Sequence, residues 1–353
     1  MNYIIFLVTL VFSVQVTSAE SDLIETQPDL PSEKKVIGSD EIRPYELSRI
    51  PDSPFGDKVK KGYELMTNSQ SMRDKYVFND QNCSNCHLGS GRVSNAAPMG
   101  ASFFAYPAYR AKNKHINSYQ ERIQGCFRYS MNGVMPEDNS DVLVAFSAYA
   151  YWLGTTTLYN IYDLDLPVPE ITDKQLLAGG KVQDFPFHPD LKAELDKAGS
   201  TTESRARMPG RGYPKISKPK LEPDYERGKV VFNKHCAACH GADGQGHEVA
   251  GIKSLPPLWG DNSYNWGAGM HKFKTAASFI YENMPLGKSI QLSTQQAWDV
   301  AVYMNSHERP QDPRFKNSVA ETKKLYHSKG SAYGEKVNGV VLGSTPLDQH
   351  HRK

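Results

Sequence analysis

The chain has 353 residues, of which 39% are hydrophobic and 23% charged, and its formal net charge at pH 7 is only +2. A balance so near neutrality favours neither nucleic acid nor an anionic membrane surface as a partner. The length allows two domains, and no stretch reaches the roughly 18 apolar residues that a membrane-spanning helix needs.

The N-terminal residues are the most apolar part of the chain. Residues 4–16 are mostly apolar, and the small residues Thr17, Ser18 and Ala19 follow them. This order is typical of a secretory signal peptide, although the first residues carry no Lys or Arg. We therefore expect a signal peptide over residues 1–19, cleavage near Ala19 and a periplasmic protein.

Polar stretches that contain proline and glycine divide the rest of the chain. Residues 20–50 predict a loosely structured arm, and residues 197–222 predict a linker between domains. The domains that these breaks separate would cover residues 51–196 and 223–312. Residues 313–353 predict a basic tail that wraps the surface.

The two predicted domains have the same internal order. Each has a helix-like opening segment, a Cys-x-x-Cys-His sequence, a long loop-rich stretch and a closing amphipathic helix. In the second domain the opening segment covers residues 225–235, and Gly228 lies shortly before the motif. Gly62 lies much farther ahead of its motif in the first domain, so we expect an insertion there.

Capping and terminator residues predict the limits of the closing helices. In the first domain this helix is expected over residues 141–153, because Gly154 is a fitting terminator. In the second domain it is expected to begin at Ser293, with Gln296 three residues on in a capping-box pattern. No region has the pattern of a strand-rich domain, so the expected fold is mainly α with long loops.

The Cys-x-x-Cys-His sequence occurs twice, as Cys83, Cys86 and His87 and again as Cys236, Cys239 and His240. On a helical turn, residues three apart lie on one face, so both thiols can reach the two vinyl groups of a haem edge. The histidine that follows then lies under the iron as its proximal ligand. We therefore predict two covalently bound haem c groups in two tandem c-type cytochrome domains.

Zinc binding and dithiol redox chemistry are the alternatives for such a motif. A zinc site would need the two cysteine pairs, which lie far apart in the chain, to converge. A thioredoxin-like dithiol would need a strand–helix unit that the sequence does not suggest. Two copies of the motif in similar helical frames favour haem over both alternatives.

Met284 is the expected distal ligand of the second iron. It is followed by proline, lies shortly before the closing helix, and offers a thioether, which raises the reduction potential of a haem. Met270 and His271 are alternatives, and simple packing is the better explanation for Met270. His247 lies so close to His240 in sequence that we expect it on the surface.

Cys126 is the one cysteine that remains when the four motif cysteines are assigned to haem. An unpaired cysteine in an exported protein needs an explanation. Because its place in the first domain matches that of Met284 in the second, we expect its sulfur on the first iron. A buried inert thiol or an intermolecular disulfide is the alternative, and Met131 and Met135 are other possible ligands.

Basic residues gather around Cys126 in the sequence, against the single acid Glu121: Arg110, Lys112, Lys114, Arg122 and Arg128. Some of them are expected to form an ordinary solvated face. Beside a haem they would instead lower the pKa of the Cys126 thiol and attract a small anion. A thiolate-ligated haem with an anion-binding shell is better suited to chemistry than to electron carriage.

The chain resembles the dihaem thiosulfate dehydrogenases, which also work as tetrathionate reductases. The resemblance runs from about Gly62 to Pro310. It rests on Asn95-Ala96-Ala97-Pro98, Glu121-Arg122-Ile123-Gln124-Gly125-Cys126-Phe127 and Ser130-Met131-Asn132-Gly133 in the first domain, and on Leu258-Trp259-Gly260, Gly267-Ala268-Gly269-Met270 and Asn283-Met284-Pro285-Leu286-Gly287 in the second. Such enzymes couple two thiosulfate ions into tetrathionate with release of two electrons, or run the reverse.

The resemblance implies roles for particular residues. The first haem would be the active one, with His87 and Cys126 as its ligands. Substrate-facing residues of the family map onto Arg122, Ser130 and a basic position near Arg110 or Lys112, between which the spacing does not choose. Electrons would pass to the second haem and on to a periplasmic carrier such as a small c-type cytochrome.

One position departs from the pattern of some family members, which have Lys directly before the distal Met of the second haem and exchange ligands on reduction. Here that position is Asn283, which cannot bind iron as a Lys amine would. We therefore expect constant ligation of the second iron by His240 and Met284.

Two other functions remain open at this level. A dihaem electron-transfer cytochrome with no small-molecule substrate would account for both motifs and Met284, but not for Cys126 and the basic residues around it. A dihaem peroxidase would need an iron position that can be emptied and acid–base groups that the sequence does not show.

Overall fold

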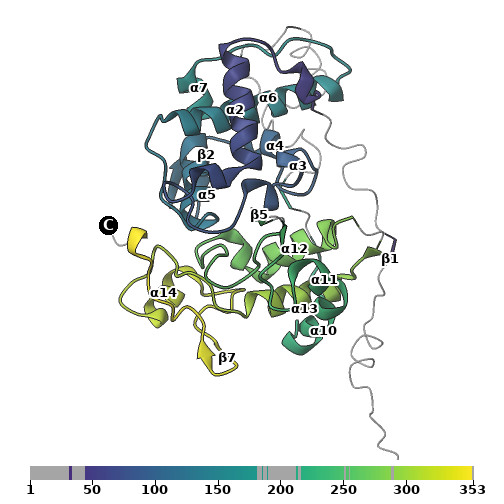
Figure 1. The fold of residues 1–353 in the computed structure, drawn as a ribbon, viewed down its shortest axis with the longest axis vertical. Coiled ribbons are helices and arrows are strands. Elements are labelled where there is room, and N and C mark those ends of the chain that lie inside the picture. The colour runs from purple at the N-terminus through teal and green to yellow at the C-terminus, as the bar shows by residue number, and fades with distance from the viewer. Residues whose placement is uncertain are drawn as a thin grey trace, which may run out of the picture.

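A computed structural model describes residues 44–180, 185, 189, 212–213, 216–247, 255–287 and 291–351, together with the backbone of residues 32–33, 248–249, 252–253 and 290. The expected signal peptide and most of the expected arm and linker lie outside the described residues. Figure 1 shows two helical parts stacked on each other, the N-terminal part in purple to teal and the C-terminal part in green to yellow. No helix in the described ranges is long and apolar enough to cross a membrane.

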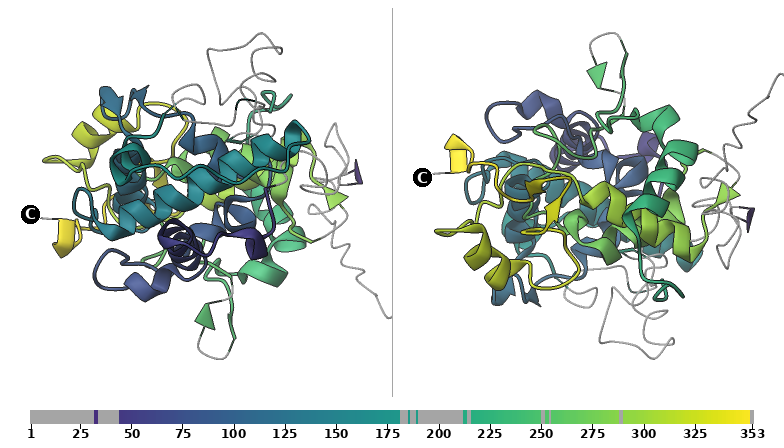
Figure 2. Two further views of the ribbon diagram at one scale, coloured as in Figure 1. Left: turned by 90° about the horizontal axis from the view of Figure 1, so that it is seen from above. Right: turned by 90° about the horizontal axis from the view of Figure 1, so that it is seen from below.

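Helices form most of the first part. They are η1 (Leu47–Arg49), α2 (Pro54–Thr67), η2 (Ser69–Met72), η3 (Cys83–Asn85), α3 (Leu88–Gly91), α4 (Met99–Phe103), α5 (Tyr119–Tyr129), α6 (Asp141–Ile161) and α7 (Asp173–Ala178). Helix α2 starts at Pro54, directly after Ser53, whose side chain accepts a hydrogen bond from the Gly56 N–H. Figure 2 shows α2 end-on from above while α6 runs across the view, so the two helices cross steeply.

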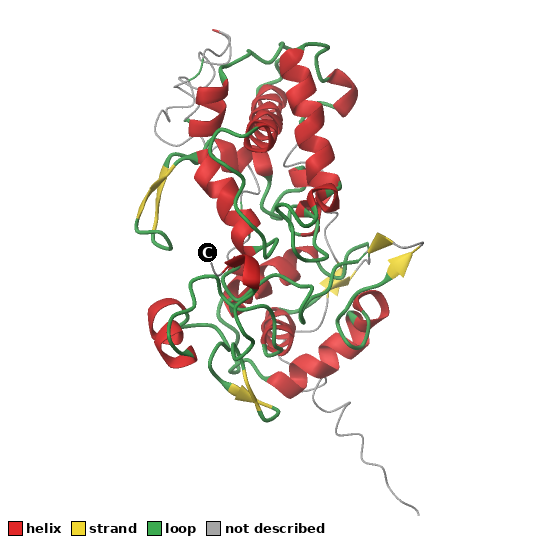
Figure 3. Cartoon of the chain, turned by 60° about the vertical axis from the view of Figure 1, so that its left-hand side comes forward, coloured by secondary structure: helices red, strands yellow, loops and turns green. Residues whose placement is uncertain are grey.

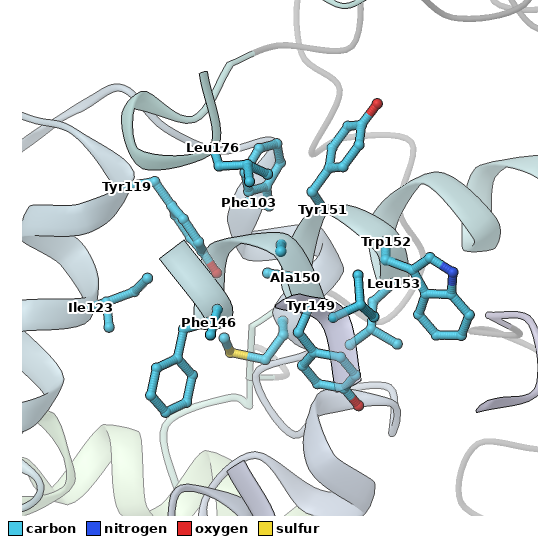
Figure 4. Close-up of a cluster of buried hydrophobic side chains, with 14 of the residues drawn as sticks. Phe103, Tyr119, Ile123, Phe146, Tyr149, Ala150, Tyr151, Trp152, Leu153 and Leu176 are labelled. Atoms are coloured by element: carbon cyan, nitrogen blue, oxygen red, sulfur yellow. The ribbon is translucent and has the colours of Figure 1, made fainter. Parts of the chain in front are cut away.

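Helix α6 is the centre of the first core and is buried along nearly its whole length. Aromatic side chains from α4 and α5, among them Phe103 and Tyr119, pack against its own Phe146 and Tyr151 (Figure 4). Because a helix that is apolar all round must be covered on every side, α6 packs against α2, α4 and α5, and so fixes the place of the helix that carries Cys126.

The expected end of this helix at Gly154 is wrong, because α6 continues to Ile161. Gly154 has an ordinary helical conformation, and a Cβ there would lie 2.5 Å from Phe104 Cε2 and 3.1 Å from the Gly100 carbonyl oxygen. The glycine is present because α4 crosses the helix at this point, not because the helix stops.

The second part contains α10 (Tyr225–His235), α11 (Ala237–His240), η5 (Gly269–His271), α12 (Phe273–Asn283) and α13 (Thr294–Asn305), and is followed by α14 (Val319–Tyr326) and η6 (Gln349–His351). The opening helix has the limits that its sequence predicted. The capping box is also confirmed, since the Ser293 hydroxyl accepts from the Gln296 N–H and the Gln296 side chain bonds back to the Ser293 N–H.

Glycine allows the same close helix crossing in both parts. A Cβ on Gly62 would lie 2.1 Å from the Ala145 carbonyl oxygen on α6, and one on Gly228 would lie 2.1 Å from the Asp299 carbonyl oxygen on α13. Opening and closing helices therefore touch backbone to backbone in each part. This shared crossing supports the internal repeat that the sequence predicted.

Strands are short and peripheral in the described ranges, which confirms the expected mainly α fold. Four antiparallel pairs join β1 (Ser32–Glu33) to β6 (Ile290–Gln291), β2 (Ala108–Arg110) to β3 (His115–Asn117), β4 (Glu248–Val249) to β5 (Ile252–Lys253), and β7 (Lys336–Val337) to β8 (Val340–Val341). The β2–β3 hairpin projects from the first part in Figure 3. Its first strand ends at Arg110.

Candidate active site

A cavity in the first part is lined by both motif cysteines, Cys83 and Cys86, by His87 and by Cys126. The His87 Nδ1 lies 2.5 Å from the Ala97 carbonyl oxygen. A carbonyl can only accept, so Nδ1 carries the hydrogen and Nε2 keeps its lone pair. An imidazole oriented in this way is suited to ligate a metal through Nε2.

Helix α5 places Cys126 and Ser130 on the other side of this cavity, and Arg122 beside it. It begins at Ser118, where the Ser118 and Glu121 side chains form a capping box. Arg122, Cys126 and Ser130 then recur at intervals of four residues, which places them along one face of the helix. Arg122 Nη1 donates a hydrogen bond to Cys126 Sγ over 2.7 Å, and Ser130 lines the cavity at the helix end.

The charges around Cys126 favour its thiolate. Burial raises the pKa of this thiol, but Arg122, His87 and Arg110 outweigh burial and lower it to about 6. Burial instead raises the pKa of Cys83 and of Cys86 to about 12. Of the three cysteines that line the first cavity, Cys126 alone is therefore anionic at neutral pH.

The structure separates the two basic positions between which the spacing did not choose. Arg110 lines a second opening beside Cys126, together with Arg122, and burial followed by the Arg122 charge lowers its pKa. Lys112 points elsewhere: its Nζ lies 3.5 Å from the centre of the Tyr129 ring and donates to the Gly267 carbonyl. Arg110 therefore faces the thiolate, whereas Lys112 joins the two parts of the molecule.

The opening beside Cys126 also takes residues from the segment that was expected to be only a linker. Gly212 and Tyr213 line it, and the Gly212 carbonyl accepts a hydrogen bond of 2.7 Å from the Ala97 N–H. Burial raises the pKa of Tyr213, which keeps its hydroxyl neutral. Sequence reasoning missed this contribution, because a Pro- and Gly-rich stretch carries no sign of where its aromatic residue lies.

A separate cavity of about 440 Å³ in the second part is lined by Cys236, Cys239, His240 and Met284. Its wall is mostly apolar, and burial lowers the pKa of His240, so this imidazole is neutral. Met284 directly follows α12, at the mouth of the cavity where Leu286 is exposed.

Asn283 faces away from this cavity, and its side-chain nitrogen donates to the carbonyls of Phe279 and Asn95 at 3.0 and 3.3 Å. His271 also lies outside the cavity, with one ring nitrogen bonded to the Ala268 carbonyl and the other 3.1 Å from His327 Nδ1. Of the alternative ligands, Met270 lines both cavities.

The remaining sulfur and histidine alternatives divide between interior and surface. Met131 is buried and lines the first cavity, so the structure leaves it beside Cys126, whereas Met135 is 44% exposed. His247 is exposed, as its position close to His240 predicted.

The C-terminal segment folds back onto the first part next to Ser130. Asn132 bonds to three of its side chains: its Nδ2 donates to Asp348, its carbonyl oxygen lies 2.6 Å from His350 Nε2, and its Oδ1 lies 3.2 Å from His351 Nε2. Phe78 stacks on His350 with ring centres 4.1 Å apart. The side chains of Asp348, His350 and His351 lie close together because all three bond to Asn132. They hold the tail against the loop that follows Ser130.

Comparisons with known proteins agree with this geometry. A sequence model described as cytochrome c matches residues 225–308. A thiosulfate dehydrogenase of Thiomonas intermedia (strain K12) is 41% identical over 92% of this chain and 91% of its own length, and one of Stutzerimonas stutzeri (strain A1501) is 40% identical over 88% and 87%. A solved thiosulfate dehydrogenase (TsdBA) of Marichromatium purpuratum, in its as-isolated form, is 40% identical with a TM-score of 0.70. It matches 86% of this chain, which spans 57% of that longer solved chain.

Proposed function

The chain belongs to the thiosulfate dehydrogenase family of oxidoreductases, and we propose that its first cavity joins two thiosulfate ions into tetrathionate with release of two electrons. The Arg122–Cys126 hydrogen bond carries this proposal, because it holds an anionic sulfur beside an opening that Arg110 lines. We also propose that the same site runs the reverse reaction, the reduction of tetrathionate.

The donor groups of the two cavities fit two covalently bound haem c groups. His87 and Cys126 would ligate the first iron, His240 and Met284 the second, and the motif cysteines would attach the haem edges. When bound, the haem groups supply one-electron acceptors, which thiosulfate oxidation requires. The orientation of His87 by the Ala97 carbonyl supports this assignment, because it leaves Nε2 free to ligate.

Cationic side chains must first bring two dianions together. Two such ions roughly 4 Å apart repel each other by about 4 kcal/mol in bulk water, and by more in a buried site. Arg110 and Arg122 offset this repulsion from one side of the opening, and Ser130 offers a hydroxyl donor from the other end of the same helix face.

The Cys126 thiolate, displaced from the iron or lying beside it, would be the group that forms and breaks bonds to sulfur. Its sulfur bonds to the sulfane sulfur of one thiosulfate while two electrons leave singly, which gives a Cys126 thiosulfonate adduct. The second thiosulfate attacks the sulfane sulfur of this adduct, so tetrathionate leaves and the thiolate is restored. No proton is taken up or released, and the lowered pKa of Cys126 supplies the ionised sulfur at the start.

Purified protein tests the reaction directly. Thiosulfate should reduce ferricyanide in its presence, and a chemically reduced viologen dye should be oxidised when tetrathionate is added. A plain dihaem electron-transfer cytochrome, the alternative function, would show neither reaction. The Arg122–Cys126 contact favours the enzyme, since electron carriage alone needs no anionic sulfur at an anion-binding opening.

The remaining proposals concern where the protein works and with what. The apolar N-terminal residues 4–16 support export to the periplasm. We propose a small periplasmic c-type cytochrome as the electron acceptor. It would dock near the second cavity, where Cys239 and Leu286 reach the surface.

A further inference from the structure

The two cavities are separated by a wall that they have in common. Gln81, Cys86, Tyr264 and Met270 line both of them. Two of these residues, Tyr264 and Met270, come from the second part of the molecule. A group that fixes the positions of these two residues, or a charge placed beside them, therefore acts on both cavities at once.

Asn305, at the end of α13, holds these two residues from behind. Its Oδ1 accepts hydrogen bonds from the Tyr264 hydroxyl at 3.2 Å and from Arg309 Nη2 at 3.1 Å, and its Nδ2 donates to the Met270 carbonyl at 3.0 Å. Asn305 is completely buried. The side-chain amide of Asn305 thus connects Tyr264 and Met270 in the common wall to Arg309 by hydrogen bonds.

Arg309 is itself completely buried, and its guanidinium lies over the face of Tyr264, 4.3 Å from the ring centre, and 5.1 Å from that of Trp266. Beyond its bond to Asn305, Nη2 reaches only the Met304 carbonyl, at 3.3 Å. Nε and Nη1 have no hydrogen-bond partner among the described residues.

The neighbouring carboxylate does not pair with this guanidinium. Glu308 Oε1 accepts from Trp266 Nε1 at 2.8 Å and from the Arg309 backbone N–H at 3.2 Å, and Oε2 accepts from the Gly343 N–H. Burial of a charge with no ion partner is unfavourable, and stacking on aromatic rings offsets only part of that cost. A cation kept at such a cost directly behind the common wall calls for a functional reason.

We propose that Arg309 sets the reduction potentials of both haem groups by placing a fixed positive charge behind the wall that separates them. Each iron loses one positive charge on reduction, so a nearby cation favours the ferrous state of both. Arg309 thereby makes both haem groups better electron acceptors. The inference rests on the proposed binding of two haem groups, but not on the substrate.

The test is a redox titration of the haem-loaded protein in the absence of thiosulfate, followed by absorption. In Arg309→Met the ferrous-to-ferric ratio of both haem groups at a fixed solution potential should fall by about three- to tenfold, where tenfold corresponds to 59 mV for a one-electron couple. Haem content, measured in the same preparation, reports separately on cofactor attachment. The exposed Arg49, which lies outside both cavities, serves as the control: Arg49→Gln should leave both potentials unchanged.

A second variant adds a negative charge beside Arg309 without removing the arginine. Asn305→Asp keeps Arg309 and the shape of the side chain but adds a carboxylate at the guanidinium, so it should lower both potentials as well. It also decides the question if Arg309→Met does not fold. Unchanged potentials in Asn305→Asp, or a fall at only one of the two haem groups, would overturn the proposal.

Discussion

The two cavities are built on the same helix crossing and differ mainly in what faces the motif histidine. In the first part Cys126 lies against Arg122, next to an opening that Arg110 lines. In the second part Met284 lies in a mostly apolar wall. One scaffold thus holds an anionic sulfur with cations around it at one site and a neutral thioether at the other.

The repeated fold thus separates substrate chemistry from electron carriage. A thioether in an apolar wall raises the potential of a haem and offers nothing to an anionic substrate. A thiolate beside two guanidinium groups stabilises ferric iron and attracts anions. Substrate chemistry is therefore expected at the first site and electron exit at the second.

The largest effect is expected from Cys126, because it makes the first site unlike the second. Cys126→Met copies the second site into the first and should lower kcat by at least about 10³-fold, since the group that bonds to sulfur is gone. Cys126→Gly should do the same, while both haem groups stay attached through the motif cysteines. The measurement is thiosulfate-dependent ferricyanide reduction together with haem content. Substantial activity in either variant would reject the catalytic role of this thiol.

A smaller loss is expected from the cation beside the thiolate. Arg122→Gln should reduce kcat/KM for thiosulfate by about 10- to 100-fold, because the anions and the thiolate lose a buried positive charge. Arg128→Gln is the matched control on the same helix: this arginine bonds to the Pro313 carbonyl and lines neither cavity. Equal losses in the two variants would mean that net charge, not the Arg122–Cys126 contact, matters.

At the second site we expect the iron ligands to stay the same in both oxidation states. Asn283 is buried and bonded to two backbone carbonyls, so Met284 should remain the distal ligand in both oxidation states. Spectra of the second haem before and after reduction should show no exchange of ligand. Asn283→Lys restores the residue that some family members have, and a ligand exchange should then appear. An exchange already present in the natural sequence would contradict this account.

The sequence predicted the features that local spacing encodes. The two motifs, the limits of α10 and the capping box at Ser293 follow from residues only a few positions apart. The predicted end of α6 at Gly154 was wrong because glycine both ends helices and allows two helices to cross closely. Only the position of α4, which the sequence does not give, shows that Gly154 serves the crossing.

Part of the site could not be predicted, because it depends on contacts between distant segments. Arg110 and Lys112 have the same charge two residues apart, and the hairpin turn sends them to different neighbours. Tyr213 and Arg309 reach their places through contacts with residues far away in the sequence, such as Phe279 and Tyr264.

The smallest expected effect concerns tail residues 348–351, where the side chains of Asp348, His350 and His351 bond to Asn132 in the first part. Burial, followed by the charge of His350, lowers the pKa of His351 to about 4, whereas a released histidine titrates near 6.5. Between these values the released tail binds a proton that the docked tail does not, so docking weakens as the pH falls. The protection of the tail amides, measured as their exchange relative to the intrinsic rate at each pH, should therefore fall as the pH is lowered from about 7 to about 5.

His351→Asn is the control for this effect, because it keeps a polar side chain opposite Asn132 and removes the titrating group. An equal fall in amide protection of this variant over the same pH range would show that another group is responsible. Residues 348–351 do not line the second cavity, so the absorption spectrum of the second haem should be unchanged over this pH range.

The most direct test of the whole account is the coordination of the first iron. Electron paramagnetic resonance of the oxidised protein should show two low-spin ferric signals, one of them with the narrow g-value spread of histidine–thiolate ligation. That signal alone should disappear in Cys126→Met. If neither signal has thiolate character, or if the thiolate signal survives the loss of Cys126, the lone thiol is not on the iron and the catalytic assignment of the first cavity fails.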